Sequence, residues 1–306
     1  MEDLYPTKRK SKWRSFFDIL RWIPVMMVIG IIVWATYIYI IDVCRWTEGR
    51  TEQFNYLIVF GIIFSMIYWS FLRVICTRSC GVPDEFKLPP NIYRKLAEAE
   101  SMMICHSILK EFSRNLPIKN INPNGSIRYC EKCRNIKPDR CHHCSSCRKC
   151  VLKMDHHCPW INNCVSFGNY KFFVLFLLYT IVGCVYVMST TYADGYRLWK
   201  IGELHGVCFQ IVSLFFMALL LGFSTITLLF YHFYLVLKNQ TTIESMRKPL
   251  FKASLNIKSF NIGLKNNFFE VFGRNPFLWC LPIYTTEGDG VDFPVTLREC
   301  EEEPLV

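Results

Sequence analysis

Charge is missing from four long stretches of this 306-residue chain, although 20% of its residues are charged overall. Each stretch is about as long as a helix needs to cross roughly 30 Å of hydrocarbon. Four buried core helices are a poor alternative, because a chain of this size has too little polar surface to cover them. We therefore predict four transmembrane helices, at 22–41, 54–72, 172–193 and 207–237.

Other features that would indicate particular functions are also missing. The sequence has no glycine-rich nucleotide loop and no basic stripe interleaved with aromatic residues. The formal charge of +10 is therefore assigned to membrane topology and attraction to anionic lipid, and no nucleic-acid partner is expected. Within the predicted spans the only histidine is His232, and Asp and Glu are absent, which disfavours a zinc transporter. No small-residue cleavage site follows the first apolar stretch, so a cleavable signal peptide is not expected.

The distribution of basic residues predicts the orientation in the membrane. Segments 1–21, 73–171 and 238–306 carry six, seventeen and eight Lys and Arg residues, whereas the loops 42–53 and 194–206 carry two each. The positive-inside rule places both termini and the large middle loop in the cytosol and the two short loops in the lumen. Cytosolic cysteines are kept reduced, so metal binding or catalysis is favoured over disulfides.

Half of the sixteen cysteines and four of the seven histidines fall within 35 residues, from Cys130 to Cys164. Zinc prefers four Cys or His ligands in a tetrahedron, so two ions would need eight of these twelve candidates. Spacing alone leaves several divisions open. One economical division assigns one ion to Cys130, Cys133, His143 and Cys150, and the other to Cys144, Cys147, His157 and Cys164. Metal binding would then fold this polar domain, residues 128–171, into β-hairpins and loops.

Four candidate ligands are left over by that division: Cys141, His142, His156 and Cys158. The run Asp155-His156-His157-Cys158 joins a carboxylate, an imidazole and a thiol, the composition of a Cys-His-Asp nucleophile system. Neighbouring zinc ions and a protonated histidine would lower the pKa of the thiol. The alternative is a non-catalytic membrane scaffold, for example a ubiquitin-ligase adaptor, which would need the metal ligands but not Cys158.

The stretch from Cys130 to Phe173 resembles the DHHC family of protein S-acyltransferases, the integral-membrane palmitoyltransferases. Thr241-Thr242-Ile243-Glu244 is similar to the TTxE motif of that family, and Asn267–Gly273 is similar to its conserved C-terminal element. Two spans before the cluster and two after it also match the family topology. The resemblance covers most of residues 20–285 and is strongest to small four-span members of the Golgi and plasma membrane.

The resemblance implies roles for the residues of the Asp-His-His-Cys run. Cys158 would be the nucleophile, His156 its general base, and Asp155 the group that orients the imidazole. Two structural zinc ions would be held by the ligand sets given above, so His157 would be a ligand rather than a base.

The resemblance also implies how the tail is coupled to the zinc domain. Thr241 or Thr242, in the motif that ends at Glu244, would reach the neighbourhood of Asp155. Asn267 would tie the C-terminal element to the last spans.

The implied reaction is a two-step acyl transfer. Cys158 would take a long-chain acyl group from palmitoyl-CoA, and a membrane-proximal cysteine of a protein substrate would take it from Cys158. An acyl cavity among the spans is implied, with candidate residues Trp160, Phe173, Phe176 and Gly183. Gly183 either leaves room for a long chain or is a helix-packing glycine. Lys137 and Arg140 are candidate contacts for the phosphates of CoA.

The predicted fold class is an all-α polytopic membrane protein with four transmembrane helices. A cytosolic, zinc-bound cysteine-rich domain of β-hairpins and loops lies between spans 2 and 3. Leu88–Leu116 is predicted to be one charged helix, and the chain after Pro282 is predicted to be mobile. Cys76 and Cys80 are either S-acylated or inert juxtamembrane thiols. The predicted location is the Golgi, the plasma membrane or both.

Overall fold

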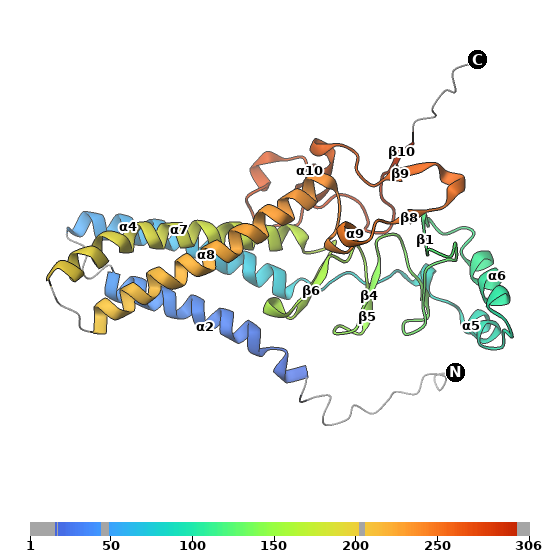
Figure 1. Cartoon of the computed structure of the whole chain (residues 1–306), viewed down its shortest axis with the longest axis horizontal. Helices are drawn as coiled ribbons and strands as arrows, with labels where there is room; N and C mark the ends of the chain where they lie inside the picture. The colour runs from blue at the N-terminus through green and yellow to red at the C-terminus, as the bar shows by residue number, and fades with distance from the viewer. Residues whose placement is uncertain (1–15, 17, 44–48, 202–205, 299–306) are drawn as a thin grey trace, which may run out of the picture.

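The computed structural model describes residues 16, 18–43, 49–201 and 206–298 (Figure 1). Most of the predicted N-terminal segment 1–21 lies outside the described residues, as do parts of the two predicted lumenal loops and the acidic end of the chain, 299–306.

Four long apolar helices form one bundle at one end of the molecule (Figure 1). Each has the length and composition to cross a membrane, which confirms the prediction of four such helices. Large apolar side chains such as Met26, Phe54 and Phe223 are exposed along the bundle, as expected where lipid rather than water surrounds a helix. The helices are α2 (Ile23–Ile38), continued by the π-helical turn η1 (Tyr39–Val43), α4 (Arg50–Cys76), α7 (Tyr170–Ile201) and α8 (Gly206–Lys238).

Close packing inside the bundle depends on stacked aromatic rings and on small residues. Tyr39 of η1 stacks on Phe60 of α4 with ring centroids 4.1 Å apart. Gly183 of α7 faces α4 so closely that an added Cβ atom would lie 2.9 Å from Cδ1 of Ile67. A glycine at this point lets the two helices approach, as small residues do in membrane bundles.

Three short antiparallel hairpins form the cysteine-rich domain at the other end of the bundle (Figure 1). Each hairpin turn contains a residue in the left-handed region: Arg134 (φ 53°), Arg148 (φ 55°) or Asn162 (φ 45°). Because the domain is built from strands and turns, the description all-α does not hold for the whole chain. The hairpins pair β2 (Tyr129–Cys130) with β3 (Asn135–Ile136), β4 (His142–Cys144) with β5 (Lys149–Val151), and β6 (His156–Cys158) with β7 (Asn163–Val165).

The chain after α8 wraps back over the cysteine-rich domain. The short helix α9 (Thr242–Met246) follows α8, and α10 (Leu264–Phe272) packs on α7 and α8. Two further strand pairs complete this region: β1 (Asn120–Ile121) with β8 (Leu250–Phe251), and β9 (Ile257–Ser259) with β10 (Thr296–Leu297). The remaining single turns are η2 (Asp84–Phe86), η3 (Pro159–Ile161), η4 (Ala253–Leu255) and η5 (Pro276–Leu278).

Two predictions about segments outside the spans were wrong. Leu88–Leu116 is not one helix but two, α5 (Pro90–Ala97) and α6 (Met102–Phe112). The side chain of Ser101 accepts a hydrogen bond from the backbone of Ile104 and so begins a new helix. The chain after Pro282 is not mobile as far as residue 298, because Phe293 is only 3% exposed and β10 pairs with β9.

Arg140 joins the cysteine-rich domain to the segment that follows α8. Its side chain is fully buried, and its guanidinium binds both carboxylate oxygens of Glu244, at 2.8 Å and 2.7 Å. The remaining terminal nitrogen donates to Oδ1 of Asn239 at 2.8 Å. Burial by itself would raise the pKa of Glu244, but the charge of Arg140 holds that pKa below its usual value. A bidentate pair of this kind fixes both the distance and the angle between the two segments.

We expect Arg140→Met to lower the free energy of unfolding by about 3–5 kcal/mol, because it leaves the buried carboxylate of Glu244 without a counter-charge. The midpoint of thermal unfolding in detergent measures the loss. The matched control is Arg148→Met, since the Arg148 side chain is 46% exposed and pairs only with Asp18 among the described acidic residues. Equal midpoints for the two variants would contradict this account of the domain junction.

Candidate functional site

The hairpin register brings the candidate metal ligands together. His143 on β4 lies directly opposite Cys150 on β5, and His157 on β6 lies directly opposite Cys164 on β7. The preceding hairpin supplies two further cysteines to each pair, one at the end of a strand and one in the turn. The resulting clusters are Cys130, Cys133, His143 and Cys150, and Cys144, Cys147, His157 and Cys164, with the donor atoms of each set within 4.8 Å of one another.

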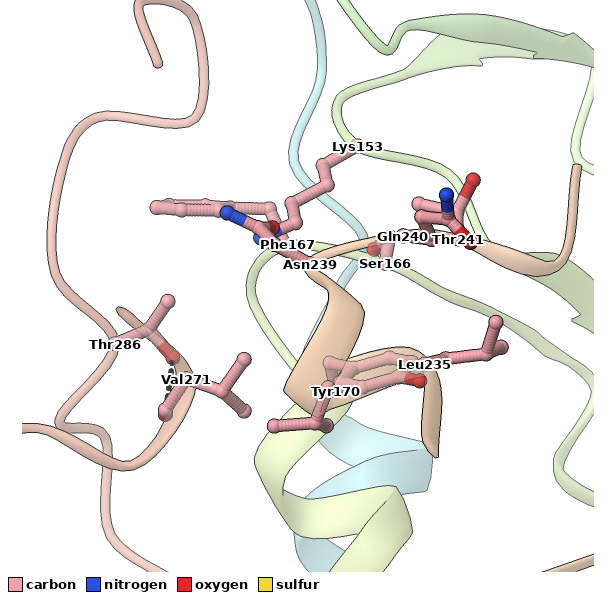
Figure 2. A pocket seen from close by; sticks show the side chains of 11 residues that line it. Lys153, Ser166, Phe167, Tyr170, Leu235, Asn239, Gln240, Thr241, Val271 and Thr286 are labelled. Carbon is pink, nitrogen blue, oxygen red and sulfur yellow. Dashed lines mark hydrogen bonds between the residues drawn. The ribbon is translucent and has the colours of Figure 1, made fainter. Parts of the chain in front are cut away.

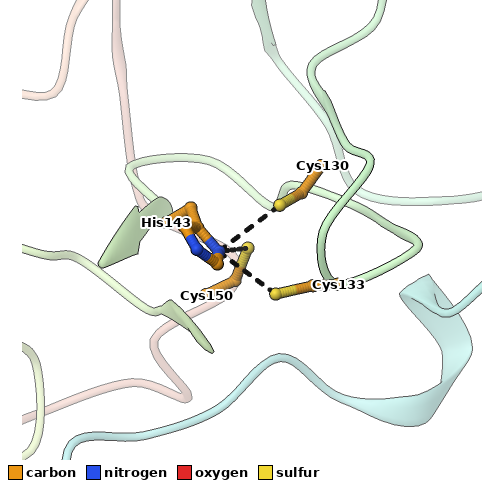
Figure 3. A group of neighbouring side chains, drawn as sticks. All are labelled: Cys130, Cys133, His143 and Cys150. Carbon is orange, nitrogen blue, oxygen red and sulfur yellow. Dashed lines mark hydrogen bonds between the residues drawn. The ribbon is translucent and has the colours of Figure 1, made fainter. Parts of the chain in front are cut away.

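Both clusters have the donor chemistry and the spacing of a tetrahedral metal site. Nδ1 of His143 lies 3.5, 3.2 and 3.9 Å from the sulfur atoms of Cys130, Cys133 and Cys150 (Figure 3). In the second cluster, Nδ1 of His157 lies 3.4–3.7 Å from its three sulfur atoms. Ordinary zinc–sulfur and zinc–nitrogen bond lengths at a tetrahedral angle would put these atoms about 3.6 Å apart. Each cluster could therefore hold one metal ion.

The sequence holds a signal for this division that the ligand counting above missed. Both sets follow the pattern Cys-x2-Cys-x9-His-x6-Cys, and the second begins 14 residues after the first, at Cys144 instead of Cys130. The left-handed turn residues Arg134, Arg148 and Asn162 repeat at the same interval of 14. A third hairpin therefore continues the repeat, and its first cysteine position is Cys158.

Cys158 belongs to neither cluster among the described residues. Where the first two hairpins have their second cysteine, Cys133 or Cys147, the third has Ile161, which is buried in the apolar core below. Cys158 thus occupies a position that holds a candidate metal ligand in the first two hairpins, but its own hairpin has no cysteine at the next position of the motif. The sequence therefore provides no complete ligand set that includes its thiol. Cys158 is 6% exposed and belongs to the apolar core of the helix bundle.

His156 and Asp155 form a hydrogen-bonded pair next to Cys158. Nδ1 of His156 lies 2.6 Å from Oδ2 of Asp155, and the imidazole also has a hydrogen bond to the Cys158 thiol. Burial by itself would lower the pKa of His156, but the hydrogen bonds to Asp155 and Cys158 raise it to about 9. Burial would raise the pKa of Asp155, yet its hydrogen bonds and the neighbouring histidines hold that pKa below its usual value.

Asp155 is held in place by the segment that follows the fourth span. The backbone amide and the hydroxyl of Thr242 each donate to an Asp155 carboxylate oxygen at 2.8 Å. Thr241 instead caps α9 in a reciprocal arrangement with Glu244. The C-terminal element is attached close by, because the buried side chain of Asn267 donates to the carbonyl of Leu237 at 2.7 Å.

His232 extends this polar group into the fourth helix. It is 2% exposed, its Nδ1 is 3.0 Å from the Tyr170 hydroxyl, and its ring centroid is 5.7 Å from that of His156. Asp155, His156 and His232 form the third group of donor atoms within 4.8 Å in the described chain. The sequence marked His232 only as the one histidine in a span, so its place beside the pair could not be predicted.

Of the residues predicted to line an acyl cavity, Phe173 and Phe176 share one apolar cluster of the helix bundle, whereas Trp160 is exposed. Phe173 packs its ring edge against His156, with centroids 5.5 Å apart, and belongs to the same apolar cluster as Cys158. The ring centroid of Phe176 lies 5.0 Å from that of Phe71 of α4, and Trp160 is 53% exposed on η3. Gly183 lies against Ile67, the packing position described above.

Arg140 does not lie where a contact with CoA phosphates would require. Its guanidinium is buried and occupied by Glu244 and Asn239, so the prediction of a phosphate contact for Arg140 was wrong. Lys137 is half-buried on the preceding loop and remains a candidate. The carboxylate partner of Arg140 lies 104 residues further along the chain, so the residues around position 140 give no sign of this ion pair.

A small cavity lies where the cysteine-rich domain meets the end of α8 and α10 (Figure 2). At about 20 Å³ it has room for one water-sized group. It does not extend along the bundle, because its walls come from the hairpin end, the end of α8 and α10. Its lining includes Lys153, Ser166, Phe167, Tyr170, Leu235, Val236, Asn239, Gln240, Thr241, Val271 and Thr286.

Comparisons with known proteins give one consistent result. Residues 123–249 match the family model described as DHHC palmitoyltransferase. The chain is 43% identical over 290 residues to palmitoyltransferase ZDHHC20-A of Danio rerio, a match that covers 93% of this chain and 80% of that protein. It is 40% identical over 297 residues to palmitoyltransferase ZDHHC20 of Homo sapiens, covering 95% and 81%. It is also 40% identical over 288 residues to palmitoyltransferase ZDHHC2 of Rattus norvegicus, covering 93% and 78%.

We expect two metal ions per purified chain, measured by elemental mass spectrometry, because each cluster offers a complete set of four donors. Cys133→Ser and Cys147→Ser each remove one ligand and should each lower the metal content by about one ion. Cys158→Ser is the matched control, since it changes a hairpin cysteine that belongs to neither cluster. Loss of an ion from the control would show that the division of ligands is incorrect.

Proposed function

Because this chain belongs to the DHHC palmitoyltransferase family, we propose that Cys158 carries the acyl group in its protein S-palmitoyltransferase reaction. One observation supports this role above the others. Of eight cysteines between residues 130 and 164, Cys158 is the one that combines freedom from both clusters with a hydrogen bond to a histidine. That histidine is held in turn by a carboxylate, Asp155. An oriented base beside a free thiol is the arrangement of an activated nucleophile.

The first step forms the acyl-enzyme. Asp155 holds Nδ1 of His156, so the other ring nitrogen, Nε2, takes the proton of the Cys158 thiol. The thiolate attacks the carbonyl carbon of palmitoyl-CoA, and the bond from that carbon to the CoA sulfur breaks. The departing CoA thiolate receives the proton from His156, which leaves the enzyme acylated and the imidazole neutral.

The second step repeats the same proton movements with a different thiol. His156 takes the proton of a substrate cysteine, and the resulting thiolate attacks the acyl carbon on Cys158. The bond to the Cys158 sulfur breaks, and that sulfur regains a proton from His156. One thioester is exchanged for another in both steps, so the work of the residues is positioning and thiolate formation.

Two structural zinc ions are part of the proposal. The three sulfurs and one imidazole of each cluster suit zinc and are closed sets of four, as in structural sites. The bound ions supply cross-links between hairpins that have little hydrophobic core of their own. Cys130, Cys133, His143 and Cys150 would hold one ion, and Cys144, Cys147, His157 and Cys164 the other.

The chain is an integral membrane protein, and we assign its hairpin domain and termini to the cytosolic side. The excess of Lys and Arg in segments 1–21, 73–171 and 238–306 supports this orientation. Acyl-CoA and membrane-proximal cysteines of protein substrates are both available at that face. The Golgi and the plasma membrane are the proposed locations.

The acyl chain is proposed to enter the bundle beside Phe173, which lies between His156 and the apolar core. Phe176 and Gly183 follow deeper in α7, and Trp160 covers the entrance from η3. Lys137 is the proposed contact for the phosphates of CoA.

Cys158→Ala is expected to abolish hydroxylamine-labile labelling of the purified protein by radiolabelled palmitoyl-CoA while both metal ions are retained. The matched control is Cys76→Ala/Cys80→Ala, which removes two juxtamembrane thiols outside the clusters and should keep the label. Equal label on wild type and Cys158→Ala would assign acylation to other cysteines. Absence of label from the wild type at full metal content would favour a non-catalytic scaffold.

Gly183→Tyr tests whether this position limits the acyl chain. If chain length is set there, the variant should use myristoyl-CoA better relative to stearoyl-CoA than the wild type does, measured as acyl-enzyme formed by each. Gly222→Tyr is the packing control, because an added Cβ at Gly222 would lie 3.2 Å from Cβ of Cys184. Gly183 would have a packing role only if the variant lost acyl-enzyme formation equally with both donors. The same conclusion would follow if both variants showed the same chain-length profile.

A further inference from the structure

The chain that follows α10 contains a markedly apolar loop. It runs from Pro276 to Tyr284, reads Pro-Phe-Leu-Trp-Cys-Leu-Pro-Ile-Tyr, and contains no charged residue. Phe277 is 88% exposed, Tyr284 is 50% exposed, and Cys280 is also exposed. Large apolar side chains in such positions indicate contact with a lipid or a partner rather than with water. Residues Pro276–Tyr284 are called the apolar loop below.

Two polar side chains from the beginning of α7 bind the backbone of the apolar loop. The ammonium group of Lys171, 2% exposed, donates to the carbonyls of Leu278 (2.8 Å) and Ile283 (3.1 Å) and to the hydroxyl of Thr285 (2.8 Å). All three of its N–H donors therefore have an acceptor. The hydroxyl of Tyr179 donates to the carbonyl of Cys280.

These contacts place the apolar loop beside the membrane-spanning part of α7. The third span begins at Tyr170, and Tyr179 lies nine residues further on, a rise of about 13 Å along the helix. Helical side chains tilt toward the N-terminus, so the Tyr179 hydroxyl lies somewhat nearer to the start of the span than its backbone does. Figure 1 shows this part of the chain, next to α10, beside the hairpin end of the bundle rather than beyond it.

Irregular backbone at membrane depth requires that its polar groups be satisfied by protein. Lys171 and Tyr179 satisfy three carbonyls of the apolar loop in this way, while the side chains of Phe277 and Tyr284 remain exposed. A water-facing loop would need neither feature, since water would satisfy the carbonyls. A docking site for a polar protein would not be expected to lack charge over nine consecutive residues.

We propose that the apolar loop is a membrane anchor, embedded in the leaflet that surrounds the hairpin end of α7, with Phe277 and Tyr284 in contact with lipid. The four apolar helices already define a lipid-facing surface, and the apolar loop continues it. This inference does not rest on the catalytic role of Cys158.

The anchor is mechanically connected to the hairpin domain. Glu270 of α10 accepts a hydrogen bond from Lys153 at 2.6 Å and another from Asn239 at 2.6 Å. Lys153 lies two residues before Asp155 in the chain. An anchored loop therefore fixes how far the hairpin domain stands from the bilayer.

Thiol accessibility in a bilayer tests the proposal directly. The full chain is placed in phosphatidylcholine/phosphatidylserine nanodiscs and treated with a charged, water-soluble maleimide, and alkylation of individual peptides is followed by mass spectrometry. Cys280 and a Phe277→Cys variant should react about tenfold more slowly, or slower still, than a Met103→Cys control, because a charged reagent does not enter hydrocarbon. Met103 is 81% exposed on α6, which Figure 1 shows at the end of the molecule away from the spans.

A second pair of variants separates burial in lipid from burial in protein. Phe277→Asp should expose the anchor and raise the alkylation rate of Cys280 toward that of the Met103→Cys control, whereas Phe277→Leu should not. Alkylation of Cys280 and Phe277→Cys at the control rate in nanodiscs would overturn the proposal. Protection that begins only when a protein substrate is added would also overturn it, by assigning the apolar loop to a protein partner.

Discussion

The buried ion pair between Arg140 and Glu244 is the contact on which the site depends. It fixes the hairpin domain against the short segment that follows the fourth helix. Thr242 of that segment makes two hydrogen bonds to Asp155. Asp155 in turn determines which nitrogen of His156 faces Cys158. A buried pair of charges adds little net stability when complete but imposes one geometry, because any displacement exposes an unpaired charge to an apolar interior. The orientation of the His156 imidazole is therefore set by a contact far from the Cys158 sulfur.

The hairpins provide the rigid frame that this contact needs. Their 14-residue repeat gives each hairpin the same left-handed turn, so all three have a similar backbone, and each contributes residues to at least one of the two clusters. In the third, Ile161 occupies the position of the second cysteine and packs into the core of the helix bundle. The third repeat lacks a candidate ligand at three of the four motif positions, where it has Ile161, Lys171 and Leu178. Cys158, at the one position that is kept, therefore lies outside both clusters and within the apolar core.

Much of this arrangement could be predicted from the sequence because it depends on local patterns. Uncharged stretches gave the four helices, since length and hydropathy suffice to identify a span. The structure brings together the two groups of four residues that were proposed, and the repeat from Cys130 to Cys144 would have selected them over the other divisions. Contacts between distant segments could not be predicted. The guanidinium of Arg140 suits a phosphate contact, and its structural role becomes visible only from its hydrogen bonds to Glu244. The break between α5 and α6 was missed because charge alternation continues across it, whereas the helix is restarted by the local hydrogen bond of Ser101.

Polar groups near the membrane surface are arranged on both sides of the start of α7. On one side Tyr170 and His232 form a hydrogen-bonded pair next to His156. On the other, the adjacent Lys171 binds the backbone beyond α10. Both sets are buried, and a buried polar group that loses its partner costs about 1–3 kcal/mol, more if it is charged. Rotation or withdrawal of α7 would break these bonds together, so the first turn of this helix cannot move independently of the hairpins or of the tail. These bonds thereby also hold Cys158, the proposed acyl carrier, in a fixed position relative to the helix bundle.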